Sequence, residues 1–340
     1  MATLGGTVLN WKDLKDRMDP NGMPARIANV LDEAKPILND IPWMESNQPL
    51  GHQSTIQVGL PTVGFKRINY GSVSSKGTVA NIQDTMSMIE GFATTDIKAL
   101  ELYGNSNATR MGESRSFAES MAQLAVDTIW YGDVTDSIDE FNGFKVRYDT
   151  LSGNVQNSVL DAGASGDDIA SVWLIGWGAD KVYGLYPKNC MAGLRHKDWG
   201  EQLIQQDTDL GGRKLPAFVD QWTWDLGLCV KDWRYVVRIA NIDLSDLAGY
   251  TGTQASNAYT TNLVFLMKTA LRRIPNLASC RPIFYMPRSV AEGLDVQYLA
   301  RTVENVWATK DVEGKLVDTF YNIPVRIEDA LLNTEDEVTT

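Results

Sequence analysis

Histidine carries much of the acid–base and metal chemistry that proteins perform near neutral pH. This chain contains only two histidines, His52 and His196, and they lie far apart in the sequence. We interpret both as surface residues or as hydrogen-bonded loop residues. Histidine-based catalysis and histidine-based metal binding are therefore disfavoured.

Two glycine-containing motifs approach known patterns but lack the structural context that those patterns need. Residues 176–178 (Gly-Trp-Gly) follow a predicted strand, as in a dinucleotide-binding fingerprint. The third glycine is missing, and residues 182–186 read as a strand where a helix should receive the pyrophosphate. Residues 112–116, with Ser114 at their centre, resemble a nucleophile elbow without its final glycine or its preceding strand. Neither motif is interpreted as a site.

Two acidic loops could in principle hold a cation. One, at residues 133–140, contains Asp and Glu at a spacing that differs from that of an EF-hand loop. The other, at residues 207–209, has aspartates before a pair of glycines. We interpret both as solvated loops. The sequence therefore predicts no catalytic residue, no cofactor and no metal site.

Composition limits the class of protein. A net charge of −12 argues against a protein that grips nucleic-acid phosphates, because that task needs a basic surface. The three cysteines, Cys190, Cys229 and Cys280, form no Cys-x-x-Cys motif, so we expect reduced thiols and synthesis in the cytosol. No signal peptide is recognisable, and the longest apolar run, at 263–267, is too short to span a membrane.

A predicted helix at residues 113–131 organises the first half of the chain. Ser116 and Glu119 have the spacing of an N-terminal capping box. Gly132, which follows the helix, is expected to form a left-handed C-cap. One apolar stripe on this helix is expected to be buried, and it consists of Phe117, Met121, Leu124, Ala125 and Thr128.

The second half of the chain mixes strands and helices without a regular βαβ rhythm, so the sequence predicts an α+β fold. Residues 171–176 and 182–187 read as a hairpin, and residues 161–168 read as a linker between domains. A helix with one apolar stripe is predicted at 261–274. Further strands are predicted at 222–229, 233–242, 282–287 and 320–328, and a further helix at 289–301.

Two segments carry too little apolar surface to be buried on their own account. The N-terminal residues 1–26 are polar, and they form either a loose tail or an arm that orders on a neighbour. Residues 52–84 alternate apolar and polar side chains like a hairpin, but glycines interrupt the pattern throughout. Because two strands alone are marginal in water, this hairpin needs a partner surface, either its own domain or another molecule.

Several blocks of sequence follow one another in a distinctive order. The predicted helix ends in Trp-Tyr-Gly-Asp at 130–133, and the acidic loop closes with Phe-Asn-Gly-Phe at 141–144. The remaining blocks are 171–187, 224–243, 284–288 and 321–326. Taken together and in this order, the blocks resemble the major capsid proteins of tailed phages, in particular those of short-tailed podophages and some siphophages.

This resemblance implies the Hong Kong 97 phage capsid fold. Its parts would be an N-terminal arm at 1–26, an E-loop at 52–84, a P-domain at 27–51 and 85–160 with its spine helix at 113–131, and a mainly A-domain segment at 161–340. The strands at 222–243 could return to the P-domain. Inter-subunit contacts would then come from Trp11 and Leu14 in the arm and from Val63, Phe65, Lys66, Ile68 and Tyr70 in the E-loop.

The implied function is that of a major capsid protein that self-assembles into an icosahedral shell enclosing the phage genome. Its partners would be further copies in hexamers and pentamers, a scaffolding protein and a portal protein, with a cement or decoration protein as an optional addition. Double-stranded DNA would be enclosed without specific binding, and no membrane is implied. The protein would be located in the virion after assembly in the host bacterial cytoplasm. The alternatives are an enzyme or a monomeric binding module without a recognisable site.

Overall fold

The computed structural model describes residues 35–49, 51–102, 106–152, 157–205, 214–248, 263–299, 307–312 and 315–339. Within these ranges the fold is α+β and consists mostly of strands, as the sequence predicts. The predicted N-terminal arm at 1–26, with Trp11 and Leu14, lies outside the described residues.

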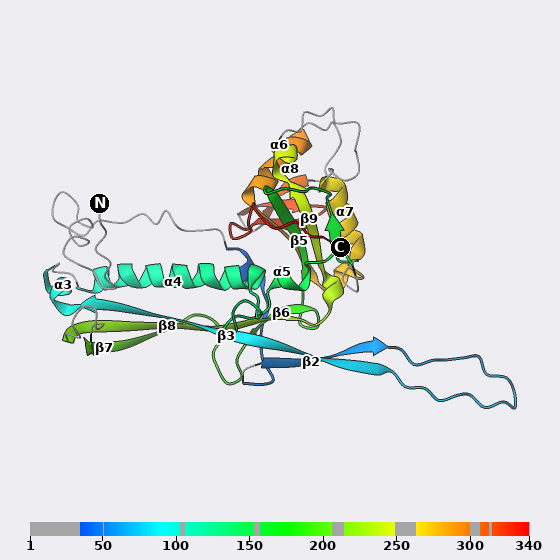
Figure 1. The fold of residues 1–340 in the computed structure, drawn as a ribbon, viewed down its shortest axis with the longest axis horizontal. Coiled ribbons are helices and arrows are strands. Elements are labelled where there is room, and N and C mark those ends of the chain that lie inside the picture. Colours follow the sequence, from blue (N-terminus) through cyan, green and yellow to red (C-terminus); the bar gives the residue numbers. More distant parts are fainter. Residues whose placement is uncertain are drawn as a thin grey trace. The chain divides into compact units, whose positions relative to one another are not determined.

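The elements follow one another along the chain as Figure 1 labels them. The first are α2 (Ile37–Asp40), β1 (Trp43–Glu45), β2 (Gly51–Gly59), β3 (Thr78–Asp96), α3 (Ile97–Leu102), α4 (Ser106–Tyr131) and α5 (Phe144–Arg147). Strands then predominate: β4 (Val159–Asp161), β5 (Ile169–Trp177), β6 (Val182–Tyr186), β7 (Arg195–Gln205), β8 (Lys214–Val230), η3 (Trp233–Tyr235) and β9 (Val236–Asp243). The last are α6 (Leu244–Ala248), α7 (Leu263–Arg273), η4 (Leu277–Ser279), β10 (Arg281–Met286), α8 (Arg288–Leu299), β11 (Trp307–Val312), β12 (Lys315–Phe320) and β13 (Ile323–Ile327).

Contacts between residues divide the chain into two compact units. In its described part, unit 1 comprises residues 88–125 and 193–225, and unit 2 comprises residues 35–87, 126–192 and 226–339. In unit 1, β7 pairs antiparallel with β8. Helix α4 packs on β3 there, since a side chain at Gly91 would meet the ring of Phe117 at 3.3 Å.

Helix α4 begins at Ser106, well before the predicted start at residue 113. Ser116 and Glu119 therefore lie inside the helix, and the predicted capping box is wrong. Arg110 in the added turns donates hydrogen bonds of 2.7 Å to both carboxylate oxygens of Asp220 on β8. This ion pair ties the early turns of the helix to the sheet, a contact that local sequence does not reveal.

The buried face of α4 is rotated from the predicted one. Ala125 and Ile129 are fully buried, whereas the side chain of Leu124 is 50% exposed. Successive helical residues are about 100° apart, so Leu124 falls beyond the edge of a face centred on Ala125 and Ile129. The predicted burial of Leu124 is therefore wrong.

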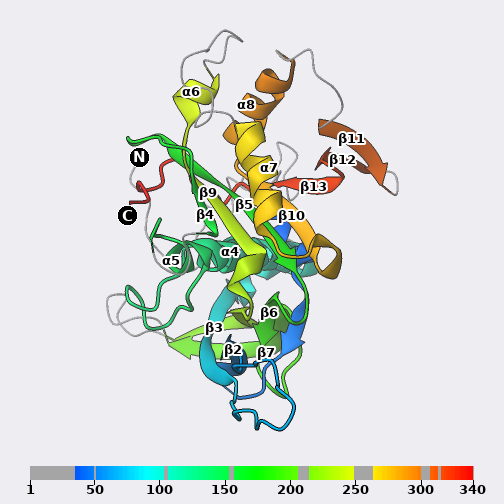
Figure 2. The ribbon, with the colours of Figure 1, turned by 90° about the vertical axis from the view of Figure 1, so that its right-hand side faces the viewer.

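The core of unit 2 is built on β5, all of whose residues are buried. It pairs antiparallel with β10 on one side and with β9 on the other. Aromatic rings pack against this strand, with the Trp130 ring 5.7 Å from that of Trp173 and 5.6 Å from that of Tyr285. Strand β5 is thus the centre of the unit, with β9, β10 and helix α7 around it in Figure 2.

The predicted hairpin between 171–176 and 182–187 is wrong, although both segments are strands. Strand β6 meets β5 at a single pair, Trp177↔Val182, and pairs mainly with β8 and β1. A strand buried on both faces needs a neighbour along each edge, and for β5 those neighbours come from distant sequence. Residues 161–168 connect β4 to β5, and both of these strands pair with β9.

Helix α7 agrees with the sequence, since its whole predicted stripe is buried. This stripe consists of Leu263, Leu266, Met267, Ala270, Leu271 and Ile274. The strand predicted at 282–287 is confirmed as β10, and the one predicted at 233–242 is confirmed as β9 only from Val236, because residues 233–235 form η3. The buried stripe of α7 is therefore predicted correctly by its periodicity, whereas that of α4 is not.

Candidate functional site

The hairpin of β2 and β3 is the segment that the sequence singles out, and the structure confirms its strands in part. Within unit 2, β2 pairs antiparallel with the first residues of β3, from Gly51↔Thr85 to Gly59↔Thr78. Residues 60–77 between them form no strand, so the alternation at 63–70 does not reflect strand pairing there. Asn69, at the turn, has a φ of 68°, a left-handed conformation that asparagine tolerates.

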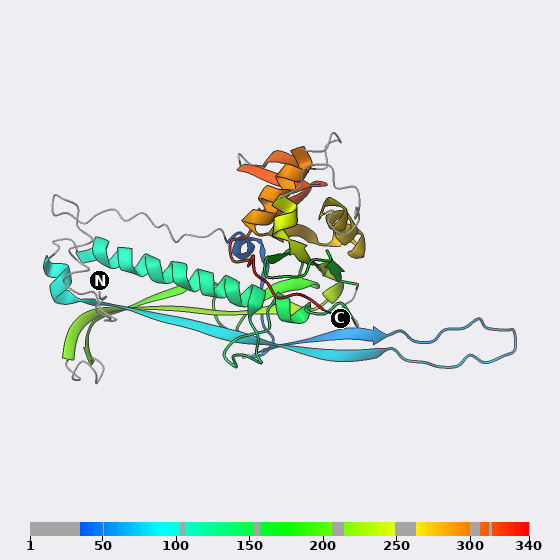
Figure 3. The same ribbon diagram turned by 45° about the horizontal axis from the view of Figure 1, so that its top comes forward.

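Residues 60–77, which we call the tip loop, expose their apolar side chains to solvent. Phe65 is fully exposed, and the exposed fractions of Val63, Ile68 and Tyr70 are 88%, 92% and 72%. Leu60 and Val73 are exposed as well. Figures 1 and 3 show the tip loop continuing past β2 and β3 with no other described element of unit 2 beside it. The structure therefore brings the predicted E-loop residues together on one segment and buries none of them.

The tip loop is also basic. It carries Lys66, Arg67 and Lys76 and no carboxylate, in a chain whose net charge is −12. All three cations are exposed, and none forms an ion pair within the described residues. A surface that binds this loop must therefore accept both apolar side chains and positive charge.

The root of the hairpin is fastened to unit 2 by buried polar contacts. Asp84 on β3 is buried, and its Oδ1 accepts a hydrogen bond of 2.9 Å from Arg147 Nη2. The same guanidinium donates from Nε to the carbonyl oxygen of Asn142, at 3.1 Å. His52 on β2 lies 3.0 Å from Tyr183 Oη through its Nε2. These contacts fix where the hairpin leaves the unit.

Two side chains at the root are held in their neutral forms near pH 7. Burial lowers the pKa of His52, against the opposing effect of Asp84, so its imidazole is neutral near pH 7. Burial, reinforced by Asp84, raises the pKa of Cys229 to about 12, which keeps the thiol protonated and a poor nucleophile.

Of the other residues that the sequence offered for chemistry, His196 forms a hydrogen bond, and others lie wholly or in part outside what the structure describes. His196 Nε2 lies 2.8 Å from Asp220 Oδ1, and its ring packs on Trp222. The side chain of Ser114 and residues 207–209 are outside the described parts. Within the described residues, no group of three or more His, Cys, Asp or Glu side chains is placed to hold a metal ion. No helix in the described part of the chain is long and apolar enough to cross a membrane.

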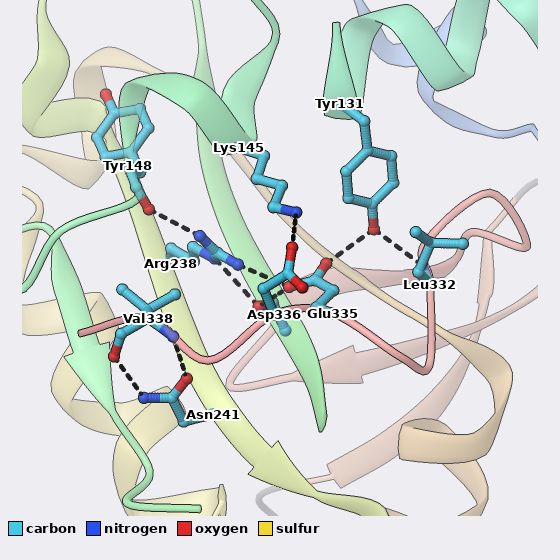
Figure 4. A network of polar contacts seen from close by, with 10 residues as sticks. Tyr131, Lys145, Tyr148, Arg238, Asn241, Leu332, Glu335, Asp336 and Val338 are labelled. Carbon is cyan, nitrogen blue, oxygen red and sulfur yellow. Dashed lines mark hydrogen bonds and ion pairs between the residues drawn. The ribbon is translucent and has the colours of Figure 1, made fainter. Parts of the chain in front are cut away.

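A second buried network, which sequence reasoning missed, joins the C-terminal segment to the core of unit 2 (Figure 4). Arg238 on β9 donates to Glu335 Oε2 at 2.6 Å, to the Tyr148 carbonyl at 2.9 Å and to Ser171 Oγ at 3.0 Å. Tyr131 Oη, at the end of α4, donates to Glu335 Oε1 at 2.7 Å. The buried charges are thus fully hydrogen-bonded, the condition under which a buried ion pair is tolerated.

A groove of about 900 Å³ runs beside β2 in unit 2. Its charged side chains are paired, Lys231 with Asp180 and Arg234 with Asp232. Val58 on β2 and Trp233 across the groove leave apolar surface exposed. The exposed apolar surface of the tip loop thus continues along the hairpin strand.

Comparison with known proteins shows the family of the chain. The family model for the major capsid protein GP7 matches residues 19–339, so the chain belongs to this family. A chain in the near-atomic-resolution structure of bacteriophage Epsilon15 is 25% identical and covers 100% of both chains, with a TM-score of 0.78. No curated protein matches the sequence.

More distant structures share less of the fold. A chain from the capsid of a native GTA particle is 9% identical, with a TM-score of 0.47 over 66% of this chain and 95% of that one. A chain of the bacteriophage JBD30 capsid is 9% identical, with a TM-score of 0.46 over 90% and 91%. The family match and the Epsilon15 likeness identify a shell-forming phage capsid protein with the Hong Kong 97-like fold. It is a structural protein of the virion that assembles with copies of itself.

Proposed function

We propose that β2, β3 and the tip loop form the E-loop of this capsid protein and that the tip loop is an inter-subunit contact. The contact residues are Val63, Phe65, Lys66, Ile68 and Tyr70. The observation that supports this most directly is the exposure of the apolar members of this set, because such a surface on one segment marks an interaction site. Fully buried on a neighbour, the apolar side chains Val63, Phe65 and Ile68 would each contribute about 1.5–3 kcal/mol.

The division of the rest of the chain follows from the same proposal. The N-terminal arm at 1–26, with Trp11 and Leu14, would contact a neighbour, and 27–51 and 85–160 would form the P-domain with α4 as its spine helix. Residues 161–340 would form mainly the A-domain, with strands at 222–243 returning to the P-domain. The grouping of residues 193–225, which include the first part of β8, in one unit with residues 106–125 of α4 supports that return for residues 222–225.

The assembly would contain hexamers and pentamers of the subunit, built with a scaffolding protein and closed at a portal protein, with an optional cement or decoration protein. It would enclose double-stranded DNA without specific binding, consistent with the net charge of −12. Assembly would take place in the host bacterial cytoplasm, and the subunit would have no catalytic activity. The neutral His52 and protonated Cys229 support the last point.

Deleting residues 60–77 tests the central proposal. Gly59 and Thr78 are paired across the hairpin, so a short glycine linker can close it without disturbing β2 and β3. We expect unchanged circular dichroism and melting, and no particles by electron microscopy. The matched control replaces exposed apolar residues elsewhere, Met191→Ser with Leu332→Ser, and should still assemble. Intact shells from the deletion variant would contradict the proposal.

A further inference from the structure

A second exposed segment of unit 2 carries the charge that the tip loop lacks. Residues 133–140, which we call the acidic loop, contain Asp133, Asp136, Asp139 and Glu140 and no basic residue. None of these carboxylates forms an ion pair within the described residues. Ile138, at the centre of the loop, is 87% exposed. The acidic loop therefore presents negative charge around an apolar side chain.

The backbone of the acidic loop is held in a defined shape. Its two ends meet where Gly143 N donates to the Gly132 carbonyl at 2.8 Å. Asn142 Oδ1 accepts from Val134 N at 3.1 Å, and Asp133 Oδ1 accepts from Thr135 N at 2.7 Å. A loop closed in this way presents its side chains with little further loss of conformational entropy on binding.

Several other acidic side chains near the surface of unit 2 are paired within the subunit itself. Asp329 pairs with Arg288, Asp336 with Lys145, and Asp180 with Lys231. The acidic loop and the tip loop are complementary, since each gathers charges of one sign that form no ion pair within the described residues. Because neither finds its counter-charge within the described subunit, the counter-charge would come from another copy.

We propose that the tip loop of one subunit docks on the acidic loop of a second copy, with Lys66 and Arg67 facing Asp136 and Asp139. Ile138 adds its side chain to the apolar contact made by Phe65 and Ile68. This inference rests on the proposed role of the tip loop as an inter-subunit segment and names its partner surface. Each copy supplies one loop of each kind, so the contact is heterologous and can be repeated around a closed ring.

Charge reversal with rescue tests the pairing in the full-length chain. Lys66→Glu with Arg67→Glu, and separately Asp136→Lys with Asp139→Lys, should each lower the yield of particles by about tenfold or more, because like charges then face each other. The variant that combines all four substitutions restores opposite charges and should recover assembly. The control Asp149→Lys with Asp167→Lys makes the same change in net charge as Asp136→Lys with Asp139→Lys, at exposed positions outside both loops, and should assemble normally.

Circular dichroism confirms that each variant is folded, and electron microscopy counts the particles. Failure of the combined variant to recover, although folded, would overturn the pairing. Normal assembly of Asp136→Lys with Asp139→Lys would overturn it too. If the deletion of 60–77 still abolishes particles in those cases, the tip loop keeps its proposed role and only the partner surface is wrong. Assembly of the deletion variant would instead remove the proposed function itself.

Discussion

Strand β5 and the tip loop are both rich in large apolar residues, yet their environments are opposite. Every residue of β5 is buried, whereas Val63, Phe65, Ile68 and Tyr70 are largely or fully exposed. Burial of β5 stabilises the subunit, because apolar surface leaves water when the chain folds. The apolar surface of the tip loop leaves water only when another molecule covers it. The comparison separates the residues that fold the subunit from those available to join subunits.

The largest expected effect is at the Arg238–Glu335 pair beside β5. Both side chains are 1% exposed, so Glu335→Ala leaves a buried, unpaired guanidinium and should cost about 3–5 kcal/mol of unfolding free energy. Urea denaturation measures this loss. Arg288→Met breaks the exposed pair with Asp329 and should cost less than about 1 kcal/mol. Equal losses in the two variants would contradict the buried network as a source of stability.

A smaller effect, of a few kcal/mol, is expected from pH at Glu328. This side chain is buried, and its Oε2 accepts a hydrogen bond from Ile37 N at 3.2 Å. Burial raises its pKa from the ordinary 4.5 to about 8, with Asp329 and Asp40 raising it further and the Ile37 amide and Lys35 lowering it. The folded state therefore holds the proton more tightly than the unfolded chain does. The stabilisation of the folded state by the protonated Glu328 is complete below about pH 4.5 and is lost as the pH rises through 8.

Melting temperatures between pH 5 and 9 test this linkage, because stability should change with pH as expected for the release of one proton. The matched variant Glu328→Gln keeps the shape of the side chain and removes the titration. We expect the difference in stability between wild type and variant to change in favour of the variant as the pH rises. A constant difference across this range would show that Glu328 does not titrate as described.

The smallest effects come from two glycines, Gly132 after α4 in unit 2 and Gly64 in the tip loop. A Cβ at Gly132 would lie 2.5 Å from the Phe141 carbonyl oxygen and 2.6 Å from that of Thr128, so Gly132→Ala should cost about 1–3 kcal/mol. A Cβ at Gly64 in the tip loop would meet nothing within 4 Å, so Gly64→Ala should change stability by less than about 0.5 kcal/mol. Thermal melting compares them, and a destabilised Gly64→Ala would mean that the tip loop packs on its own subunit.

Gly132 is correctly predicted to be a constrained position, but the predicted reason is wrong. The sequence predicts a left-handed cap after the helix, but Gly132 does not adopt a positive φ. It is placed where two backbone segments meet, with Gly143 N donating to its carbonyl oxygen at 2.8 Å. The glycine itself indicates a position where the backbone is closely approached. Which segment approaches it depends on how the acidic loop folds back.

The sequence by itself determined the features that depend on local pattern. The buried stripe of α7, the strands β9 and β10, and the lack of a core of its own in the tip loop all follow from periodicity and from the position of glycines. Those patterns are local because an amphipathic element shows its buried face in its own residues. The exposure of Val63, Phe65, Ile68 and Tyr70 fits the expected need for a partner surface.

Only the tertiary structure decided which elements meet. The partners of β5, the exposure of Leu124, the early start of α4 and the Arg238–Glu335 pair involve contacts between residues far apart in sequence. Many arrangements of the elements satisfy the same local pattern. The one adopted gives buried backbone groups their hydrogen-bond partners and buried charges their counter-charges, from residues far apart in the sequence. From local sequence alone, an arginine in a strand or a glutamate near the end of the chain is predicted to be solvent-exposed. Its burial depends on the other segments that pack around it.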